Sequence, residues 1–452
     1  MIKNDYEAFL NDNFKISPVL RFIYGKRDKE TLSHYDNYLD DEYINKQKEI
    51  LEKYKNTKHI ELKIEIEQYN FLYNNYFNLL LFSSYRNFII EFQYDTNNIY
   101  PKNEVYKNLR QKDFDKLILS CIEKAKLGLK HKITFPKITI KKFLDKIKKI
   151  DQYSHLYNFI KKDYYPFCRN DIGLCYINNG KEIYRRLVKE YTGNLDITPE
   201  EIHKLGMDYP KKKIISIEKF SSRDEMMNNC IDYANYIYET TIDKYFDYKP
   251  KQRFILVPIP DELEKNSALG YYNDIEGKIF INLSYFNEIS KKEIHTLIMH
   301  ECFHFYHFQY MKHLNIPKYS YYAYSNIALV EGFAHYMEIY CDDYDELNDV
   351  NTLVRKLRLV VDTGINYYGW TYKQAFNYMK KYLPDKITDI KNEIDRYICM
   401  PGQAVCYLVG KRHIIKLRDE FLNNGGNIKD FHYKLLKNGF ATFTTIHKEF
   451  DK

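Results

Sequence analysis

The sequence predicts a mostly α-helical protein with one small antiparallel β-sheet, and three observations lead to this fold class. Apolar residues recur at steps of three and four along most of the chain, which is the period of an amphipathic helix. Strand-like runs are few and lie close together near the middle of the chain. Hydrophobic residues make up 44% of the 452 positions, which is enough for a sizeable core and excludes a disordered chain.

The first part of the chain is predicted to be helical almost throughout. Residues 43–92 have the pattern of one or two long amphipathic helices, and residues 113–129 and 140–162 repeat it. We expect residues 1–170 to form an N-terminal helical region and residues 171–452 to form the catalytic region, within one integrated catalytic unit.

The next predicted helix has a clear start signal. Thr198 can act as the N-cap, Pro199 suits the first helical position, and Glu201 is placed to close a capping box. We expect this helix to end at Gly206 and a further helix to cover residues 222–245.

Two short runs then have strand character. Residues 253–258 and 277–282 are rich in β-branched and aromatic side chains and are separated by a turn-rich link. We expect these two strands to pair antiparallel. Helical periodicity returns from residue 291 to about residue 422, so the sheet directly precedes the helices that carry the densest group of histidines.

The charge and the cysteine content narrow the functional classes. Lys and Arg total 69 against 62 for Asp and Glu, so the net charge is +7, which is too small over this length to predict nucleic-acid binding. The eight Cys form no C-x-x-C pair, and no apolar run approaches the roughly 18 residues of a membrane span. The first residues lack the hydrophobic segment of a signal peptide. We therefore expect a reduced, cytoplasmic protein that binds neither nucleic acid nor membrane.

The most informative motif is H-E-x-x-H at residues 300–304. On a helix, His300 and His304 share one face, so their rings can hold a single Zn²⁺. Glu301 then stands beside the open coordination position, where it can take a proton from a zinc-bound water. The surrounding residues are apolar nearly all round the helix, which indicates that the helix and its polar groups are buried.

A third ligand is available on the next predicted helix. Residues 326–336 are almost entirely apolar apart from Glu331 and His335, and Asn326 or Ser325 can cap this helix. Two His and a downstream Glu form the ligand set of thermolysin-type sites, so we assign Glu331 as the third zinc ligand.

Three more residues near the motif each allow more than one interpretation. His335 either supports the ligands from behind or is a hydrogen-bonded core residue, and Glu338 either contacts a ligand or faces solvent. His307 lies seven residues after His300 and so on the same face of the helix. It can bind substrate, support a ligand, or replace His304 as the second ligand if the helix bulges.

A series of short blocks accompanies the metal motif. They are residues 184–187 and 195–206, the His300 helix, Glu331-Gly332-Phe333-Ala334, residues 358–364, Gly369-Trp370-Thr371, Arg396-Tyr397 and Pro401-Gly402-Gln403-Ala404. In these blocks, from about residue 173 to residue 421, the chain resembles the domain-of-unknown-function family 885. That family consists of predicted zinc peptidases with a distant similarity to thimet oligopeptidase, angiotensin-converting enzyme and carboxypeptidase Taq.

The resemblance implies a helical metallopeptidase-like fold, with the small sheet beside a deep active-site cleft, and a zinc cofactor. The chain departs from the family at two places. Where the family usually has H-E-x-x-P-G-H, His304 stands at the position of the Pro and Tyr306 at the position of the second His. Asn366 stands where the family tends to have a His after its Asp-Thr-Gly block.

The resemblance also implies roles for residues outside the motif. In the similar oligopeptidases a Tyr on a late helix stabilises the oxyanion, and Tyr407 and Tyr397 are the candidates here. Arg396 can clamp a substrate carboxylate or form a structural ion pair, and Gln403 can donate a hydrogen bond to the peptide.

The strand before the metal motif is a candidate for substrate binding. If residues 278–282 form a sheet edge, an extended peptide can add to it through main-chain hydrogen bonds, next to Phe280 and Asn282. The alternative is a hairpin with a structural role only.

Together these observations predict a zinc-dependent hydrolase that cleaves amide bonds, most simply a metallopeptidase acting on short peptides. Glu301 is the general base, and Zn²⁺ is held by His300, His304 and Glu331. One alternative is a zinc amidohydrolase acting on a non-peptide amide, and another is a non-catalytic binding protein that keeps the cleft. The sequence leaves the oligomeric state open.

Overall fold

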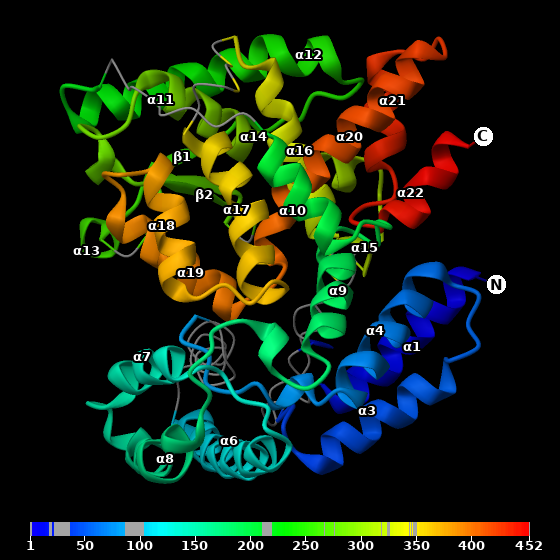
Figure 1. The fold of residues 1–452 in the computed structure, drawn as a ribbon. Helices are drawn as coiled ribbons and strands as arrows, with labels where there is room; N and C mark the ends of the chain where they lie inside the picture. The colour runs from blue at the N-terminus through cyan, green and yellow to red at the C-terminus, as the bar shows by residue number, and fades with distance from the viewer. Residues whose placement is uncertain are drawn as a thin grey trace. The chain divides into compact units, whose positions relative to one another are not determined.

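The structure is a computed structural model, and it shows a mostly helical protein with one small sheet, as predicted (Figure 1). The structure describes residues 2–17, 20–21, 37–85, 104–209, 219–265, 267–274, 276–317, 319–322, 326–342, 344, 346 and 350–451. Within these ranges, every helix is too short or too polar to cross a membrane.

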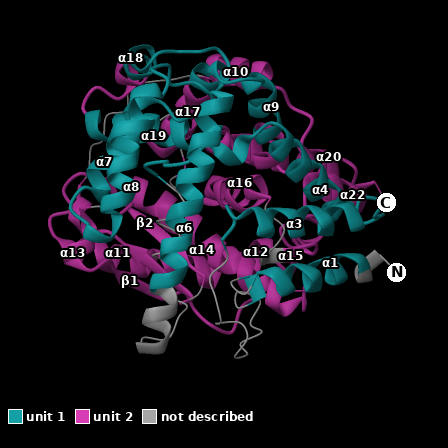
Figure 2. Cartoon of the chain, turned by 90° about the horizontal axis from the view of Figure 1, so that it is seen from below, with its two compact units in different colours: residues 1–187, 364–378, 386–401 teal, residues 188–363, 379–385, 402–452 magenta. Residues whose placement is uncertain are grey.

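The chain divides into two compact units, and each is described here by itself (Figure 2). Unit 1 contains residues 1–187, 364–378 and 386–401. Unit 2 contains residues 188–363, 379–385 and 402–452. The sequence suggested one division, near residue 170. In the structure the first boundary follows residue 187, and residues 364–378 and 386–401 also belong to the N-terminal unit.

Unit 1 is built from helices. They are α1 (Ile2–Ile16), α3 (Asp41–Lys53), α4 (Ile60–Asn74), α6 (Glu104–His131), α7 (Lys137–Ile147), α8 (Ser154–Phe159), the first part of α9 (Gly180–Tyr191) and α19 (Ile387–Cys399). Helices α6, α7 and α8 contribute Leu117, Phe143 and Leu156 to one buried apolar core. The apolar residues spaced three and four apart on these helices therefore face a common core, as the sequence predicted.

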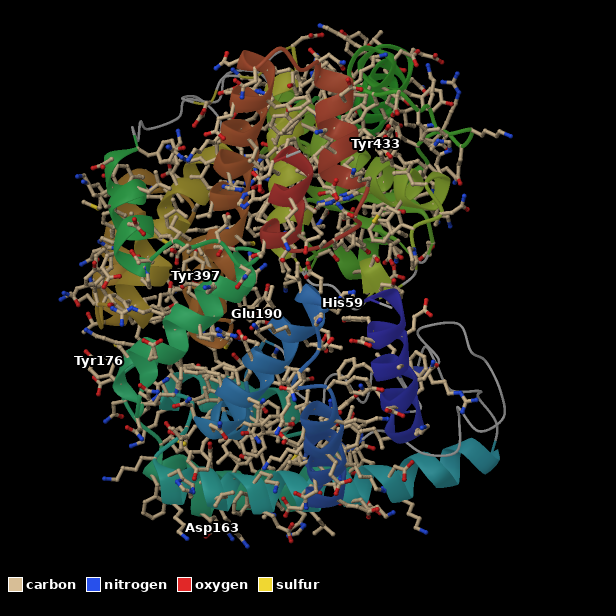
Figure 3. All side chains as sticks on the ribbon, turned by 90° about the vertical axis from the view of Figure 1, so that its right-hand side faces the viewer. His59, Asp163, Tyr176, Glu190, Tyr397 and Tyr433 are labelled. Atoms are coloured by element: carbon tan, nitrogen blue, oxygen red, sulfur yellow. The ribbon has the colours of Figure 1, made fainter. Side chains whose placement is uncertain are left out.

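The helix predicted over residues 113–129 is confirmed and is longer in the structure, as α6, whereas the other two predicted segments are divided. The predicted helix over residues 43–92 is divided after α3, and the imidazole of His59 caps α4 by accepting the N–H of Leu62 at 3.4 Å (Figure 3). Its last part, residues 86–92, lies outside the described residues. The helix predicted over residues 140–162 is divided because the backbone of Ile150 is extended.

Unit 2 combines the three-stranded sheet with a second set of helices. They are α10 (Pro199–Asp208), α11 (Arg223–Tyr236), α12 (Ile242–Tyr245), α13 (Asp261–Glu264), α14 (Lys291–His313), α15 (Tyr319–Tyr322), α16 (Ile327–Met337), most of α17 (Val350–Asn366), α20 (Cys406–Asn423), α21 (Ile428–Leu436) and α22 (Phe443–Phe450). Helix α18 (Tyr372–Tyr382) has residues in both units.

The capping box predicted for α10 is present. Thr198 Oγ1 accepts the N–H of Glu201 at 3.2 Å, and the Glu201 carboxylate accepts the N–H of Thr198 at 2.8 Å. The helix continues past Gly206 to Asp208. Gly206 is a contact point rather than a terminator, because a Cβ there would lie 2.7 Å from Leu359 of α17.

The sheet has three strands in the order β1-β3-β2, where β1 is Leu256–Pro258, β2 is Gly270–Asn273 and β3 is Lys278–Ile281. The prediction that the first and last of these pair antiparallel is wrong, because β1 and β3 are parallel. The unpredicted strand β2 forms the hairpin with β3, in antiparallel register. The chain between β1 and β3 therefore makes one extra reversal, and the sheet is mixed.

Helices α16 and α20 touch at glycine. A Cβ at Gly410 of α20 would lie 2.0 Å from the carbonyl oxygen of Ala328 in α16. A Cβ at Gly332 of α16 would lie 2.7 Å from the backbone of Gly410. Only hydrogen fits at these two positions, so the glycines fix how closely α16, with its Glu331, lies against α20.

Candidate metal centre

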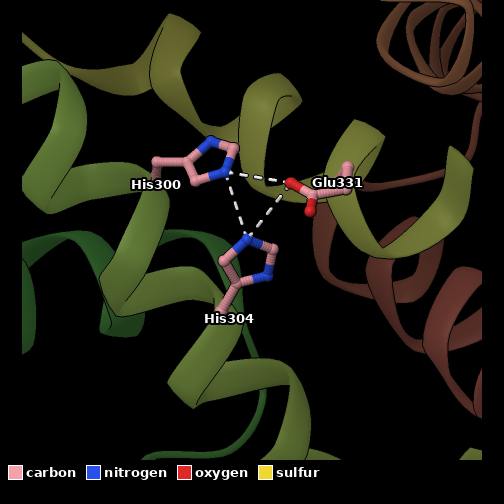
Figure 4. Close-up of side chains that lie close together, drawn as sticks. All are labelled: His300, His304 and Glu331. Atoms are coloured by element: carbon pink, nitrogen blue, oxygen red, sulfur yellow. Dashed lines mark hydrogen bonds and ion pairs between the residues drawn. The ribbon is translucent and has the colours of Figure 1, made fainter. Parts of the chain in front are cut away.

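Helix α14 places the two histidines of the motif on one buried face. Its start is fixed by a capping box, in which Ser290 Oγ accepts the N–H of Glu293 at 3.2 Å and the Glu293 carboxylate accepts the N–H of Ser290 at 2.8 Å. The helix is regular from there to His313, so His300 and His304 are one turn apart and point the same way (Figure 4).

Helix α16 brings Glu331 to the same point. The side chain of Asn326 caps this helix by accepting the N–H of Leu329 at 2.9 Å, as one of the two predicted caps. His300 Nε2 lies 3.3 Å from Glu331 Oε2, and His304 Nε2 lies 3.5 Å from the same oxygen. The two Nε2 atoms are 3.1 Å apart. The three predicted ligands thus meet in a small triangle (Figure 4).

This triangle has the dimensions of a zinc site. Tetrahedral ligands at about 2.0–2.1 Å from a zinc ion lie about 3.3 Å from one another. The three edges, 3.1, 3.3 and 3.5 Å, lie close to that value. Two imidazoles and one carboxylate are also the donor set of three-ligand zinc sites that keep a fourth position open. The residues present therefore fit the metal that the sequence predicts.

A buried carboxylate holds His300 from behind. His300 Nδ1 lies 2.8 Å from Glu338 Oε1, and Glu338 in turn accepts a hydrogen bond from Arg355 at 2.9 Å. Glu338 is only 1% exposed, so this ion pair is shielded from water. Such a contact fixes the tautomer of a ligand histidine and turns its other nitrogen toward the metal.

Of the two interpretations of Glu338, the structure supports contact with a ligand. The role of Arg355 was missed in the sequence. The sequence held a signal for Glu338, which follows Glu331 by seven residues and directly succeeds the last residue of α16, but it held none for Arg355.

The electrostatics of the cluster favour charged forms. Burial lowers the pKa of His300, but hydrogen bonds to Glu331 and Glu338 outweigh it and raise the pKa to about 9. Burial raises the pKa of Glu331, but its contacts with His300 and His304 outweigh this and hold the pKa well below its usual range. In the metal-free protein the carboxylates are therefore balanced by a proton on His300, which a metal ion must displace.

Glu301 points into a cavity next to the ligands. Its carboxylate accepts the main-chain N–H of Tyr272 in β2 at 2.8 Å, which fixes its position. The cavity has a volume of about 370 Å³. It is lined by Gly270, Tyr271, Tyr272, Leu297, His300, Glu301, His304, Glu331, Glu338, Asn351, Val354, Arg355, Arg358 and Tyr407.

His307 lies outside the triangle. Its ring is buried against Phe333 and Phe440, with ring centroids 5.3 and 4.9 Å away, and neither ring nitrogen has a hydrogen-bond partner in the structure. Burial and the nearby His304 lower the pKa of His307 to about 3, so the ring is neutral. Among the described residues, the triangle forms with His304 and not with the alternative, His307.

The predicted oxyanion donors have different surroundings. Tyr407 on α20 lines the cavity. Tyr397, labelled in Figure 3, belongs to unit 1. Its hydroxyl donates to Glu393 at 2.6 Å, and Arg396 forms an ion pair with the same carboxylate at 3.6 Å. Gln403 is buried at the start of the segment that leads into α20 and does not line the cavity.

The predicted edge strand is wrong. Strand β3 lies between β1 and β2, so both of its edges are paired. Phe280 stacks on Tyr271 of β2 at 5.2 Å, and the Asn282 side chain donates to the carbonyl of Glu264 at 2.8 Å. The strand that lines the cavity is β2, whose short G-Y-Y-N sequence gave no strand signal.

Comparisons with known proteins agree with this fold. The sequence profile of a family described as a bacterial protein of unknown function (DUF885) matches residues 210–449, which is more than half of the chain. No curated protein matches the chain.

Two solved structures are similar to the chain over most of their length. A "putative lipoprotein" from Colwellia psychrerythraea is 20% identical, with a TM-score of 0.68, over 82% of this chain and 80% of that protein. A "putative lipoprotein of unknown function" from Shewanella oneidensis is 14% identical, with a TM-score of 0.66, over 100% of both chains. At these identities the likeness concerns the fold alone.

These neighbours bear on the predicted location. The sequence predicts a reduced, cytoplasmic protein. Both neighbours are described as a "putative lipoprotein", and a lipoprotein is held at a membrane surface by its lipid. This finding contradicts the cytoplasmic prediction, which is withdrawn.

Proposed function

The chain belongs to the DUF885 family of bacterial proteins, and we propose that it is a zinc-dependent hydrolase that cleaves an amide bond in a short peptide. The observation that carries this proposal is the triangle of His300, His304 and Glu331, with Glu301 beside it in the same cavity. Three protein ligands leave a coordination position for the reaction, which is typical of catalytic rather than structural zinc sites.

The side chains divide the work of hydrolysis between them. Zinc held by the three ligands would make a water molecule more acidic and polarise the amide carbonyl. Glu301 takes the proton from the attacking water and delivers it to the leaving amine. The hydrogen bond from the Tyr272 N–H holds this carboxylate in place while it does so. Tyr407 lines the same cavity, and we assign its hydroxyl as the donor that stabilises the oxyanion.

The cavity favours a small substrate. Its volume of about 370 Å³ is near the lower end of the range for ligand pockets, roughly 300–1,000 Å³. The Tyr272 N–H is taken by Glu301, but the main chain of Gly270 and the carbonyl of Tyr272 also face away from β3, because hydrogen-bond directions alternate along an antiparallel pair. An extended peptide can lie along this edge of β2, in the role that the sequence assigned to β3.

The replacement Glu301→Gln tests the proposed function. It removes the base and keeps the size of the side chain, so we expect turnover to fall by about 10²–10⁴-fold with zinc content unchanged. The readouts are mass spectrometry of a short-peptide library and metal analysis of the same samples. Glu293→Gln is the matched control, since it lies on the same helix and a Gln can still close the capping box. Turnover of Glu301→Gln within a few-fold of the parent would show that the mechanism is wrong.

The small cavity also supports a second candidate, a zinc amidohydrolase that acts on a non-peptide amide. The two candidates share the metal site and Glu301, so only the substrate separates them. Acylated amines without an amino acid, added to the peptide library, distinguish the two. Hydrolysis of these compounds in preference to every peptide would support the second candidate.

A further inference from the structure

One face of helix α17 forms part of the cavity wall. Asn351, Val354, Arg355 and Arg358 all line the cavity, and they are spaced at three, four and seven residues from the first. This is the spacing of a single helical face. Two guanidinium groups therefore stand in the same cavity as Glu301 and the predicted zinc ligands.

The two arginines have different partners. Arg355 donates to the buried carboxylate of Glu338 at 2.9 Å, so its charge is used to hold the group behind His300. The guanidinium of Arg358 lies over the ring of Tyr407, 4.9 Å from its centroid. A guanidinium held on an aromatic face keeps its N–H donors in its own plane, where they match the two oxygens of a carboxylate.

The charge of the loaded site favours an anion. Three carboxylates line the cavity, namely Glu301, Glu331 and Glu338, against the two guanidinium groups of Arg355 and Arg358. A bound Zn²⁺ adds two positive charges, so these residues and the metal together carry one net positive charge. Without Arg358 that balance would be neutral. The cavity is also small, and a volume of about 370 Å³ keeps any anionic group of the substrate close to the scissile amide.

We propose that Arg358 binds a carboxylate of the substrate, so that the preferred substrates are short amides with a carboxylate close to the bond that is cleaved. This inference rests on the proposed function and adds the substrate class to it. The carboxylate can be the C-terminus of a peptide or an acidic side chain. Arg358, not the predicted Arg396, is then the residue that selects for it, and it acts on binding and orientation.

The test measures binding without turnover. Calorimetry on the zinc-loaded Glu301→Gln protein compares N-acetyl-alanyl-alanine with its C-terminal amide, and with N-acetyl-alanyl-glutamic acid α-amide, whose only carboxylate is in the side chain. We expect at least one carboxylate compound to bind about 10- to 100-fold more tightly than the neutral amide, as a charge-assisted hydrogen bond allows. Which of the two binds more tightly identifies the source of the carboxylate.

The added replacement Arg358→Gln should reduce that preference to within about two-fold, while the neutral amide binds as before. A purely structural role for Arg358 would weaken all compounds alike. Arg412→Gln is the matched control. The guanidinium of Arg412 also lies over an aromatic ring, that of Tyr209, 5.4 Å from its centroid. Arg412 is on the same helix as Tyr407 but does not line the cavity. The Arg412→Gln protein should prefer the carboxylate compound over the neutral amide by the same factor as the protein with Arg412 intact.

The outcomes separate this inference from the proposed function. Zinc-loaded protein that binds acid and amide equally would overturn the role of Arg358 and leave the hydrolase proposal standing. A carboxylate preference that survives Arg358→Gln would do the same. Protein that takes up no zinc would overturn both proposals.

Discussion

Unit 2 contains two pairs of histidines in direct contact, and they differ in what surrounds them. In one pair, His300 and His304, the Nε2 atoms are 3.1 Å apart. In the other, His413 of α20 and His447 of α22, they are 2.7 Å apart. The first pair contacts the carboxylates of Glu331 and Glu338. The second packs against Phe443, and no described carboxylate is bonded to either ring.

The carboxylates reverse the chemistry of the pair. Hydrogen bonds to Glu331 and Glu338 outweigh burial and raise the pKa of His300 to about 9. Burial, together with the nearby His447 and Lys416, lowers the pKa of His413 to about 3. A cluster with surplus negative charge attracts a cation, whereas a neutral imidazole pair is satisfied by its own hydrogen bond. Contact between two histidines is therefore no sign of a metal site without the carboxylates.

The largest expected effect is the loss of zinc when His304, but not His307 or His413, is replaced. His304→Leu should reduce zinc content from about one ion per chain to near zero, because it removes one of three ligands. His307→Leu and His413→Leu should keep the metal, since both rings lie outside the triangle. Metal analysis of the three purified variants, with circular dichroism as a check on folding, makes the measurement. Loss of metal in His307→Leu with retention in His304→Leu would show that the second ligand is the other histidine.

A smaller effect is expected where the helix of Glu331 is positioned. Gly410→Ala places a methyl group against the Ala328 carbonyl and pushes α16 away from α20. We expect a loss of about 1–3 kcal/mol of folding free energy. Zinc should also bind several-fold more weakly, because Glu331 moves while the two histidines stay. Denaturant unfolding and a competitive zinc titration measure the two quantities. An unchanged zinc affinity in a destabilised protein would show that this contact is only structural.

The smallest expected effect is a difference in how the two histidine pairs make stability depend on pH. The pKa of His300 is raised, so its contribution to stability is complete below about pH 6.5 and is lost as pH rises through about 9. The pKa of His413 is lowered, so stability is lost from about pH 6.5 down toward pH 3. The melting temperature of chelator-treated protein should therefore fall both as the pH rises above about 6.5 and as it drops below about 6.5.

Zinc and a single replacement separate these two slopes. Loading zinc should remove the alkaline fall, because the metal replaces the proton on His300. His413→Leu should reduce the acid fall alone. An alkaline fall of the same size in zinc-loaded and chelator-treated protein would contradict the link to His300.

Much of the fold and the pairing of His300 with His304 on one helical face could be predicted from the sequence, because both depend on local spacing. Helical period, the capping box at Thr198 and the four-residue step from His300 to His304 are properties of one segment each. The mixed sheet could not be predicted in this way. Strand β2 is four residues long and begins with Gly270, so it carries too little pattern to be seen.

The rest of the site depends on which segments the fold brings together. Tyr397 and Tyr407 are ten residues apart and equally suitable in type, yet only Tyr407 lines the cavity. Arg396 was chosen because a carboxylate clamp needs an arginine, and Arg358, on another helix, satisfies the same chemistry. The type of side chain that the chemistry needs, a tyrosine or an arginine, can be predicted from the sequence. Which tyrosine or arginine lines the cavity depends on the fold and cannot be predicted from the spacing within one segment.

The metal content of the unaltered protein shows most directly whether His300, His304 and Glu331 hold a zinc ion. The chain is purified without chelator, exchanged into metal-free buffer and analysed for zinc beside a Glu331→Ala variant. We expect about one zinc ion per chain in the parent and close to none in the variant, because the replacement removes both a ligand and its negative charge. A parent protein with no zinc, which also fails to bind it on titration, would contradict the account.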